Sequence, residues 1–467
     1  MKSDRHAGMP AGDFRHLPSP PGPKGNLLTG NAHDFLTDRL ATLTRDREEF
    51  GDVVSYRIGP IRGVVVSRPE LVEEVLVHKA SSFKKDVMSH MLHPATGDGI
   101  FLSEGEFWKR QRRMVTPTFH KERIALYADV MVSYQEKMCE KWRSGGERDV
   151  VPDIVEMALG IAAKTLFSVD LDHEHGRTVA AAMTEVMAAV ATRITSALPL
   201  PEFVPTPVML RLKRGVAQLD KIIYQFIEDR KTGETSADDL LSLLLNARDH
   251  EGDGTGMTDR QVRDEAMTIF MAGFETTSLS LAWMCHLLAT HPEIQSRLRR
   301  EVSEVLGERR PTAADYPQLR YTEGVVNETL RLYPPVAMIG REALVDVELG
   351  GFRIDKGTAL WPAPWITHRD PQLWEMPLEF RPERWTSESR EQIPKHSFFP
   401  FGGGPHNCVG RMYAMMEMVL GIAIIVRRFE LAPVPGQEPH PFPGYTIRPE
   451  PGVTVTLVPR PSVQTHQ

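Results

Sequence analysis

The stretch Phe401-Gly-Gly-Gly-Pro-His-Asn-Cys-Val-Gly410 places one cysteine behind a turn built from glycines and a proline. The residues from Arg411 onward follow a helical pattern, so the sulfur of Cys408 is expected at the N-terminus of a helix. Backbone N–H groups and the helix dipole at that position favour a thiolate, and they can donate hydrogen bonds to the sulfur without supplying a proton. The loop therefore predicts a thiolate held in a defined geometry.

Ligation of a haem iron is the chemistry that such a thiolate suits best. A thiolate ligand pushes electron density onto the iron and favours cleavage of the O–O bond, as an oxidation requires. Two other interpretations are an inert buried cysteine and a phosphate-binding loop, although no Lys-Ser/Thr pair follows the glycines as a phosphate loop needs. Cys139 and Cys285 lack comparable surroundings and are expected to be ordinary packed cysteines.

The composition is that of one large globular domain. With 467 residues, 41% of them hydrophobic and 25% charged, the chain can bury a large core, and no linker separates independent parts. We expect a polar, Pro-rich segment over residues 1–25 and a single domain over residues 26–467. The net charge of -7 gives no general attraction to nucleic acid or to anionic membranes, so no nucleic-acid partner is expected.

The cysteine count and the apolar runs bear on the compartment. Three cysteines cannot form a disulfide framework in a protein of this size, which suits a reducing environment. The longest apolar run, residues 412–426, is interrupted by Glu417 and is shorter than the roughly 20 residues that span a bilayer. We therefore expect a cytoplasmic monomer without a membrane span, in which this run forms a core helix. The Pro-rich segments 198–207 and 431–443 are expected to be ordered connections or loops.

The hydrophobic patterns predict a mainly α-helical fold (α+β) with a small β-sheet region. Residues 53–58 and 62–67 are rich in β-branched side chains and are separated by Gly-Pro, which predicts a hairpin. Helical patterns dominate residues 69–333, and strand patterns return at residues 343–360 and 452–458.

The longest predicted helix begins at Thr258, which forms a capping box with Gln261, and it runs to about Thr290. A helix of roughly 30 residues is about 45 Å long, so it would cross the whole domain with its middle buried. That middle, residues 269–278, contains a glycine, a glutamate and two threonines, and an apolar helix would be more stable without them. A local conflict of this kind predicts a functional site.

Together with three further motifs in order over residues 108–410, the cysteine loop makes the chain resemble the cytochrome P450 family. The resemblance implies a large helical domain in which the long helix passes over a haem b. It implies Cys408 as the ligand of the iron, His406 beside a haem propionate and Phe401 as a shield for the sulfur. Gly410 matches the last glycine of the same motif.

The run Ala272-Gly-Phe-Glu-Thr-Thr277 resembles the oxygen-activation motif of that family. Ala272 and Gly273 would lie against the haem, because the missing side chain of the glycine permits the close approach of a flat ligand. The resemblance gives Thr276 and Glu275 the catalytic role of delivering protons during oxygen activation. A helix-bending threonine beside a salt-bridged glutamate is the alternative interpretation.

Glu328 and Arg331 lie at i, i+3 on a helical stretch, so their charges share one face and can pair. Surface pairs at this spacing contribute little to stability, so the motif alone also fits a solvated pair. The resemblance adds Arg384, in the run Phe380-Arg-Pro-Glu-Arg-Trp385, and implies a structural triad. Because a half-satisfied buried network is costly, loss of any member should impair folding and haem retention more than the chemistry.

The run Trp108-Lys-Arg-Gln-Arg112 resembles the W-x-x-x-R helix of the family, and its i, i+4 spacing puts the tryptophan and Arg112 on one face. The resemblance implies that both contact the haem propionates. Arg341 also matches a propionate position, with an exposed arginine as the alternative. Since arginine binds carboxylates bidentately, Arg112, Arg341 and His406 suit the two carboxylates of a haem.

The resemblance implies a monooxygenase that inserts one atom of O2 into a lipophilic small molecule by hydroxylation or epoxidation. The segments that face the substrate in the family are largely apolar here, which suggests a terpenoid, fatty acyl chain, steroid or macrolide-like compound. A haem-thiolate isomerase, dehydratase or peroxygenase without a reductase is the main alternative, and a non-catalytic haem sensor is another. The apolar side chains concerned are Met88, Met91, Leu92, Ile194, Leu198, Phe203, Phe270, Val336, Ala337 and Met338.

Electrons are expected from a separate ferredoxin or flavodoxin with its reductase, because the sequence shows no flavin or ferredoxin pattern. A basic patch on the thiolate side would suit such an acidic partner, although an ordinary solvated surface is an equally good interpretation. The candidate members of this patch are Lys109, Arg110, Arg113 and Arg411.

Overall fold

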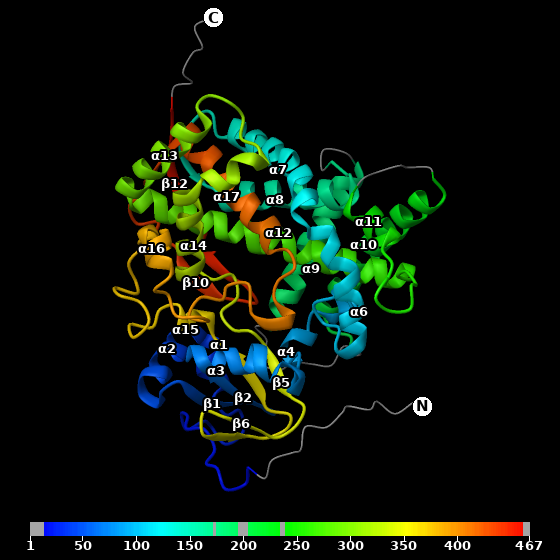
Figure 1. Ribbon diagram of the computed structural model, residues 1–467, viewed down its shortest axis with the longest axis vertical. Coiled ribbons are helices and arrows are strands. Elements are labelled where there is room, and N and C mark those ends of the chain that lie inside the picture. The colour runs from blue at the N-terminus through cyan, green and yellow to red at the C-terminus, as the bar shows by residue number, and fades with distance from the viewer. Residues whose placement is uncertain (1–13, 171–173, 195–203, 234–238, 461–467) are drawn as a thin grey trace, which may run out of the picture.

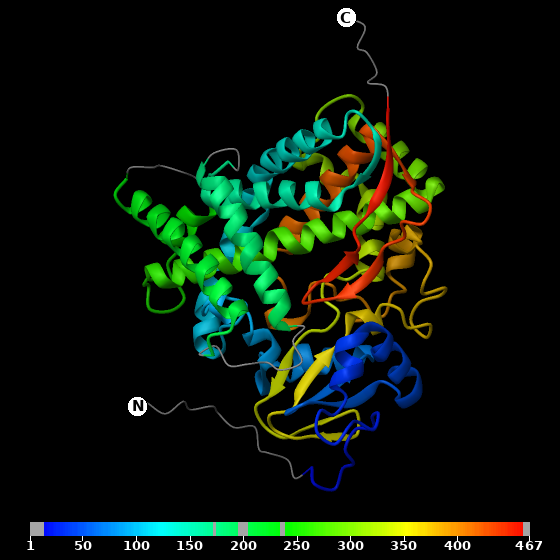
Figure 2. The same cartoon turned by 180° about the vertical axis from the view of Figure 1, so that it is seen from behind.

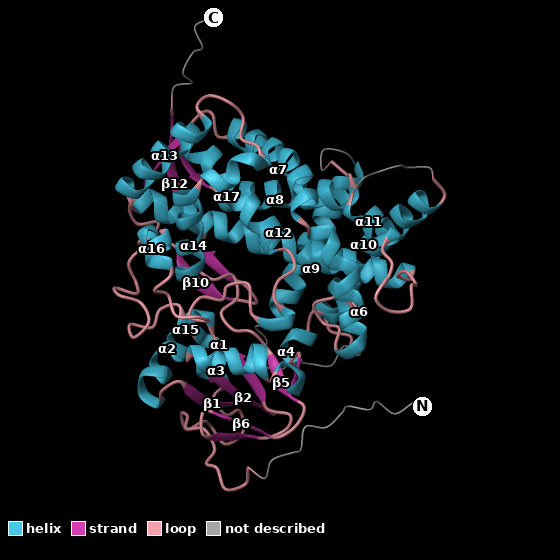
Figure 3. Cartoon of the chain, in the orientation of Figure 1, coloured by secondary structure: helices cyan, strands magenta, loops and turns pink. Residues whose placement is uncertain are grey.

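The computed structural model describes residues 14–170, 174–194, 204–233 and 239–460. Helices make up most of the described chain, and its strands form small sheets (Figure 1, Figure 3). The prediction of a mainly α-helical fold with a small β-sheet region is therefore confirmed.

The helices follow one another with short connections over most of the chain. In chain order they are α1 (Ala32–Thr37), α2 (Arg39–Phe50), α3 (Pro69–Glu73), α4 (Val87–His90), α5 (His93–Thr96), α6 (Gly105–Val115), α7 (Lys121–Lys141), α8 (Val151–Phe167), α9 (Glu174–Ile194), α10 (Pro207–Lys231), α11 (Leu240–Asn246), α12 (Asp259–Thr290), α13 (Pro292–Leu306), α14 (Arg320–Leu332), α15 (Pro364–Thr367), α16 (Ser387–Arg390) and α17 (Arg411–Arg428).

The largest sheet has the strand order β1-β2-β8-β5-β3, in which only β2 and β8 run parallel. The predicted hairpin is confirmed as its β1 and β2, joined by a turn in which Gly59 has a φ of 56°. Smaller sheets have the orders β4-β12-β9, β10-β11 and β6-β7. The strands are β1 (Val53–Ile58), β2 (Ile61–Val66), β3 (Phe83–Lys84), β4 (Gly146–Asp149), β5 (Arg341–Ala343), β6 (Val347–Leu349), β7 (Phe352–Ile354), β8 (Ala359–Pro362), β9 (Phe429–Pro433), β10 (His440–Pro443), β11 (Ile447–Glu450) and β12 (Thr454–Pro459).

Helix α12 is the central element of the fold. Thr258 accepts a hydrogen bond from the backbone of Gln261, and the Gln261 side chain accepts one from the backbone of Thr258, so the predicted capping box is confirmed. The helix ends at Thr290, as predicted, and contacts α8, α14 and α17. The C-terminal strands β9, β11 and β12 also contact it (Figure 2).

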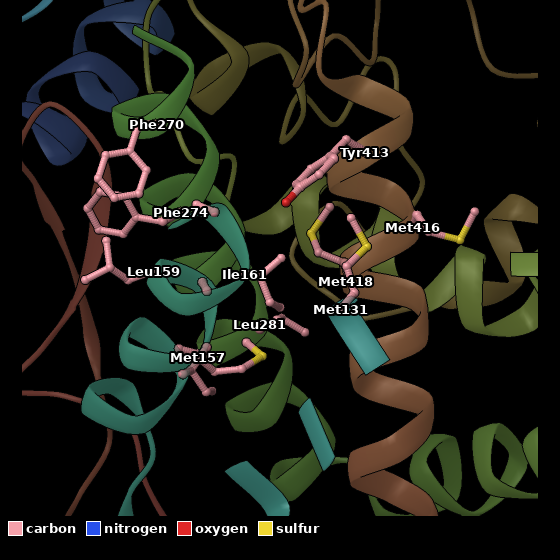
Figure 4. Close-up of a cluster of buried hydrophobic side chains, with 14 of the residues drawn as sticks. Met131, Met157, Leu159, Ile161, Phe270, Phe274, Leu281, Tyr413, Met416 and Met418 are labelled. Carbon is pink, nitrogen blue, oxygen red and sulfur yellow. The ribbon is translucent and has the colours of Figure 1, made fainter. Parts of the chain in front are cut away.

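The core gathers side chains from α7, α8, α12 and α17 (Figure 4). Phe270 of α12 meets Phe167 edge to face, with ring centroids 5.5 Å apart. Residues 415–426 of α17 are all buried, which confirms the predicted core helix in that run. Cys139 and Cys285 are buried in the same cluster, as predicted for packed cysteines.

One of the two Pro-rich segments, predicted to be an ordered connection or a loop, also contains strand residues. Residues 431–443 contain the end of β9 and the whole of β10, rather than a loop alone. Proline is tolerated in β10 because this strand pairs only with β11 and is therefore an edge strand. In the other Pro-rich segment, residues 198–203 lie outside the described residues, and Thr206 caps the start of α10.

None of the helices in the described part of the chain combines the length and the apolar character that crossing a bilayer demands.

Candidate active site

A cavity of about 410 Å³ lies at the middle of α12. Its lining comes from α12, from residues 335–341, from the cysteine loop 400–410 and from N-terminal elements that include α1 and α2. Ala272 is exposed and Gly273 is half-buried although both lie in the middle of the central helix. The helix therefore faces an open space at the position where the sequence predicts a site.

The cysteine loop owes its shape to two glycines in the left-handed region of backbone conformation. Gly402 has a φ of 72° and Gly404 a φ of 64°. A Cβ on Gly404 would lie 1.9 Å from the carbonyl oxygen of Leu76. The turn brings the N–H of Cys408 to within 2.9 Å of the Phe401 carbonyl oxygen, to which it donates. Two residues later, Gly410 is the N-cap of α17, so the sulfur lies beside a helix N-terminus.

We expect Gly404→Ala to destabilise the protein by about 3 kcal/mol, since the new methyl group meets backbone and the φ is strained for alanine. Gly403→Ala is the matched control, because its φ is −155° and its Cβ would make ordinary contacts of 3.5 Å and more. Denaturant unfolding followed by circular dichroism measures both. Equal stabilities of the two variants would contradict the steric argument.

The ionisation of Cys408 differs from the expectation for a free helix-terminal thiol. Burial is the largest influence on the pKa of Cys408 and raises it. The Gly410 N–H and the guanidinium groups of Arg112 and Arg411 act in the opposite direction without outweighing burial. The helix end and the two guanidinium groups favour the thiolate but do not outweigh burial, and the positive charge of a bound iron would act in the same direction as they do.

Basic groups from four elements converge beside the cysteine loop. Burial, together with the three cations Lys85, Arg341 and Arg112, lowers the pKa of His406 to about 3. Burial and Arg341 also lower the pKa of Lys85 to about 7. None of these four side chains forms an ion pair with a carboxylate of the described residues. Such a cluster fits an anionic group that is bound against it, as the two carboxylates of a haem would be.

Helix α6 contacts the cysteine loop through both residues of its motif. The indole of Trp108 stacks on the His406 ring, with centroids 3.8 Å apart and an interplanar angle of 29°. Arg112 donates to the backbone carbonyl of Asn407 at 2.8 Å and to its side-chain oxygen at 2.6 Å. Phe401 lines the cavity beside Cys408, and the Arg411 guanidinium lies 5.7 Å from its ring centroid. The cysteine loop is therefore contacted both by α6 and by Arg411 at the start of α17.

The opposite wall of the cavity is the middle of α12. Thr276 donates a hydrogen bond to the Ala272 carbonyl oxygen at 2.8 Å, and it lines the cavity. An added Cβ on Gly273 would meet no atom within 4 Å. The helix therefore leaves open space at Gly273, and the same cavity is also lined by Cys408 and by the four basic side chains of the cluster. The residues present fit a haem.

Glu275 lies in the cavity lining and makes polar contacts with the C-terminal part of the chain. Its carboxylate accepts a hydrogen bond from Thr446, directly before β11, at 3.2 Å and pairs with Arg448 in β11. The Glu275 side chain is 9% exposed, whereas that of Arg448 is 37% exposed. The pair therefore connects the centre of α12 with solvent.

The Glu328, Arg331 and Arg384 side chains meet in a buried network. Both Glu328 and Arg331 have 0% exposed side chains and form a bidentate pair at 2.8 and 2.9 Å. Arg384 donates to the same carboxylate at 3.2 Å, and Trp385 donates at 2.9 Å. Arg331 also donates to three backbone carbonyls, which belong to His368, Pro377 and Glu379. The solvated surface pair that the i, i+3 spacing also allowed is excluded.

Sequence reasoning missed several residues of this site. Lys85, Thr446 and Arg448 belong to no motif, and their positions follow from long-range contacts that no local spacing encodes. Trp385 carried one signal, because it directly follows Arg384 in the motif of the triad.

The predicted substrate-facing side chains are placed in three ways. Ile194, Leu198 and Phe203 lie outside the described side chains, and Met91 is buried without lining the cavity. The others line the cavity and are Met88, Leu92, Phe270, Val336, Ala337 and Met338.

The predicted basic patch is largely neutralised. Arg113 forms a bidentate pair with Asp249 at 2.7 and 2.8 Å, and Arg110 lies 3.9 Å from the same carboxylate. Lys109 pairs with Glu106 at 2.7 Å. Three of the four cations therefore have acidic neighbours; the i, i+3 pair of Glu106 and Lys109 follows from the helical spacing of α6, but the contacts with Asp249 do not.

The chain is similar to known proteins over nearly its whole length. A family model described as Cytochrome P450 matches residues 20–457. Cyclooctat-9-en-7-ol 5-monooxygenase of Streptomyces melanosporofaciens is 35% identical over 386 residues, which cover 83% of this chain and 84% of that protein. Cyclooctatin synthase of the same organism is 33% identical, with 94% of this chain and 95% of that protein covered. Pentalenene oxygenase of Streptomyces avermitilis is 30% identical, with 84% and 86% covered.

Proposed function

Because the chain belongs to the cytochrome P450 family, whose cofactor is a thiolate-ligated haem b, we propose that Cys408 ligates the iron in this protein. The chain is a cytochrome P450 monooxygenase, an oxidoreductase that uses O2. When bound, the haem supplies the activation of dioxygen and the transfer of one oxygen atom to the substrate. The observation that supports this site best is the cavity that Cys408 and Thr276 both line.

The residues that we propose to hold the haem carboxylates line this cavity. Lys85, Arg112, Arg341 and His406 would hold the haem carboxylates, because they line the cavity and form no close ion pair in the described residues, although Glu104 and Asp86 lie near enough to act on the charges of Lys85 and Arg341. Trp108 would keep the His406 ring in place through its stacking contact. Glu328, Arg331 and Arg384 would stabilise the fold behind the cysteine loop.

We propose a terpenoid as the substrate, which is hydroxylated or epoxidised. Two relatives that this chain resembles are named for oxidations of cyclooctat-9-en-7-ol and pentalenene. The apolar cavity lining supports a lipophilic molecule of this kind. The test is to screen terpenoids for a low-spin to high-spin shift of the haem and then to follow turnover under labelled dioxygen. Incorporation of one labelled oxygen atom into the product is expected, and the absence of both shift and product for all terpenoids would contradict the proposal.

The proposed electron donor is a ferredoxin or flavodoxin with its reductase. Turnover should require NADPH and these two proteins, because the sequence shows no flavin or ferredoxin pattern that could supply the electrons. Turnover with hydroperoxide alone, and none with the donor system, would instead favour a peroxygenase.

Thr276 and Glu275 are proposed to deliver protons to the reacting oxygen. The Thr276 hydroxyl lines the cavity, and the adjacent Glu275 reaches solvent through Arg448. We expect Thr276→Ala to retain haem and to consume NADPH, with product per NADPH lowered about tenfold or more and hydrogen peroxide released. Thr276→Ser is the matched control, since it keeps the hydroxyl and should restore most of the coupling. Full coupling in the alanine variant would contradict the proton-delivery role.

A further inference from the structure

Arg39 is a buried arginine that lines the cavity and has no acidic partner among the residues that the structure describes. It stands at the start of α2 and is 6% exposed. Burial alone lowers its pKa to about 10, and no neighbouring charge contributes. The side chain is therefore cationic at neutral pH, and burying such a charge without a counter-ion is costly.

The three nitrogens of the Arg39 guanidinium differ in their surroundings. Nη1 donates to the Gly444 carbonyl oxygen at 3.3 Å, and the guanidinium carbon lies 5.1 Å from the Phe35 ring centroid. Nε is buried and has no hydrogen-bond acceptor, and no described residue accepts from Nη2. Because Nε is closed off from the cavity, Nη2 is the nitrogen from which a bound carboxylate oxygen can accept a charge-assisted hydrogen bond.

Arg39 does not belong to the basic cluster beside the cysteine loop. Arg39 contacts Phe35 and Gly444, whereas Arg112 donates to Asn407 and His406 stacks on Trp108. Leu36, Ile58 and Ile61 also line the cavity and come, like Arg39, from the N-terminal elements. The haem carboxylates that the basic cluster suits would therefore leave Arg39 without a partner.

We propose that Arg39 binds the carboxylate of an anionic terpenoid, so that the acidic end of the substrate lies against α2 and its hydrocarbon part extends into the apolar cavity. This inference rests on the proposed function and names the substrate class more narrowly. The buried cation supplies orientation as well as affinity, because the remaining lining is largely apolar and offers few other points at which a hydrocarbon skeleton can be fixed.

The test compares three ligands that differ at one carbon: abietic acid, abietinol and abietadiene. Haem-loaded full-length protein is titrated with each, and the dissociation constant is measured by the spin-state shift and by calorimetry. We expect the acid to bind most tightly. Arg39→Gln should weaken the acid about 30-fold or more while leaving abietadiene within about twofold. Arg39→Lys should retain part of the preference for the acid, because lysine keeps the positive charge but lacks the planar guanidinium group.

The matched control for the charge of Arg39 is Arg62→Gln. It removes an exposed cation outside the cavity lining, with a side chain 75% exposed, and should change none of the three constants. Equal weakening of all three ligands in Arg39→Gln would show that Arg39 only supports the Gly444 turn, and an unchanged constant for the acid would also overturn the assignment.

Dodecanoate distinguishes failure of this inference from failure of the terpenoid proposal. Arg39-dependent binding of dodecanoate, with no binding of any abietane, would overturn the terpenoid and keep the carboxylate site. Binding of abietadiene without any preference for the acid would keep the terpenoid and overturn the Arg39 assignment. Absence of binding by all four ligands would overturn both.

Discussion

The ferrous carbonyl complex of a Cys408→Ser variant is expected to lack the red-shifted Soret band that a thiolate-ligated haem gives. A serine hydroxyl has nearly the same shape as the thiol, but it stays protonated and is a weak ligand for iron. The loop itself should persist, since its shape depends on Gly402 and Gly404 rather than on the sulfur. Haem content and the carbonyl spectrum of the purified variant measure the effect.

Cys139→Ala is the matched control for this loss. Cys139 is buried at 1% exposure in the hydrophobic core and does not line the cavity. Its replacement should lower stability slightly and leave the carbonyl spectrum unchanged. If the ferrous carbonyl complex of Cys408→Ser kept the red-shifted Soret band, the assignment of the iron ligand would be refuted.

The second large effect is expected at Arg331. Replacing it with leucine leaves the Glu328 carboxylate buried at 0% exposure with one remaining cation, Arg384, and removes the donor from three backbone carbonyls. Breaking a buried pair on one side costs about 3–5 kcal/mol, so Arg331→Leu should unfold at much lower denaturant and lose haem. Circular dichroism and haem absorbance during urea titration measure both losses.

An exposed pair supplies the control for Arg331. Arg297 pairs with Glu383 at 2.7 Å, but its side chain is 48% exposed. Arg297→Leu should therefore change stability by about 1 kcal/mol or less. Equal denaturation midpoints for Arg331→Leu and Arg297→Leu would contradict the structural role of the triad.

Local patterns in the sequence predicted the elements that local forces determine. The capping box of Thr258 and Gln261, the β1–β2 hairpin and the buried run of α17 each depend on residues close together in the chain. The prolines of β10 misled the same reasoning, because a sequence does not reveal which strand lies at a sheet edge.

The partners of the site residues depend on contacts between distant parts of the chain. Glu275 and Arg448 are 173 residues apart, and Arg113 and Asp249 are 136 apart, so neither pairing follows from a spacing rule. The sequence motifs identified Glu275 and Arg331 as candidate residues. The contacts that each side chain makes depend on its burial in the folded chain, which the motifs do not contain. The i, i+3 pair of Glu328 and Arg331 is the clearest case, since the same spacing fits a solvated surface pair.

The connection between β10 and β11 has a consequence for exchanging parts among relatives. Gly444 accepts from Arg39, which is proposed to select the substrate, while Thr446 and Arg448 hold Glu275, which is proposed to supply protons. A chimera that imports this hairpin to broaden substrate range would replace the supports of the proton donor in the same step. Such a chimera should therefore show altered substrate selectivity and loss of coupling together. A graft that is meant to change selectivity alone has to keep Thr446 and Arg448.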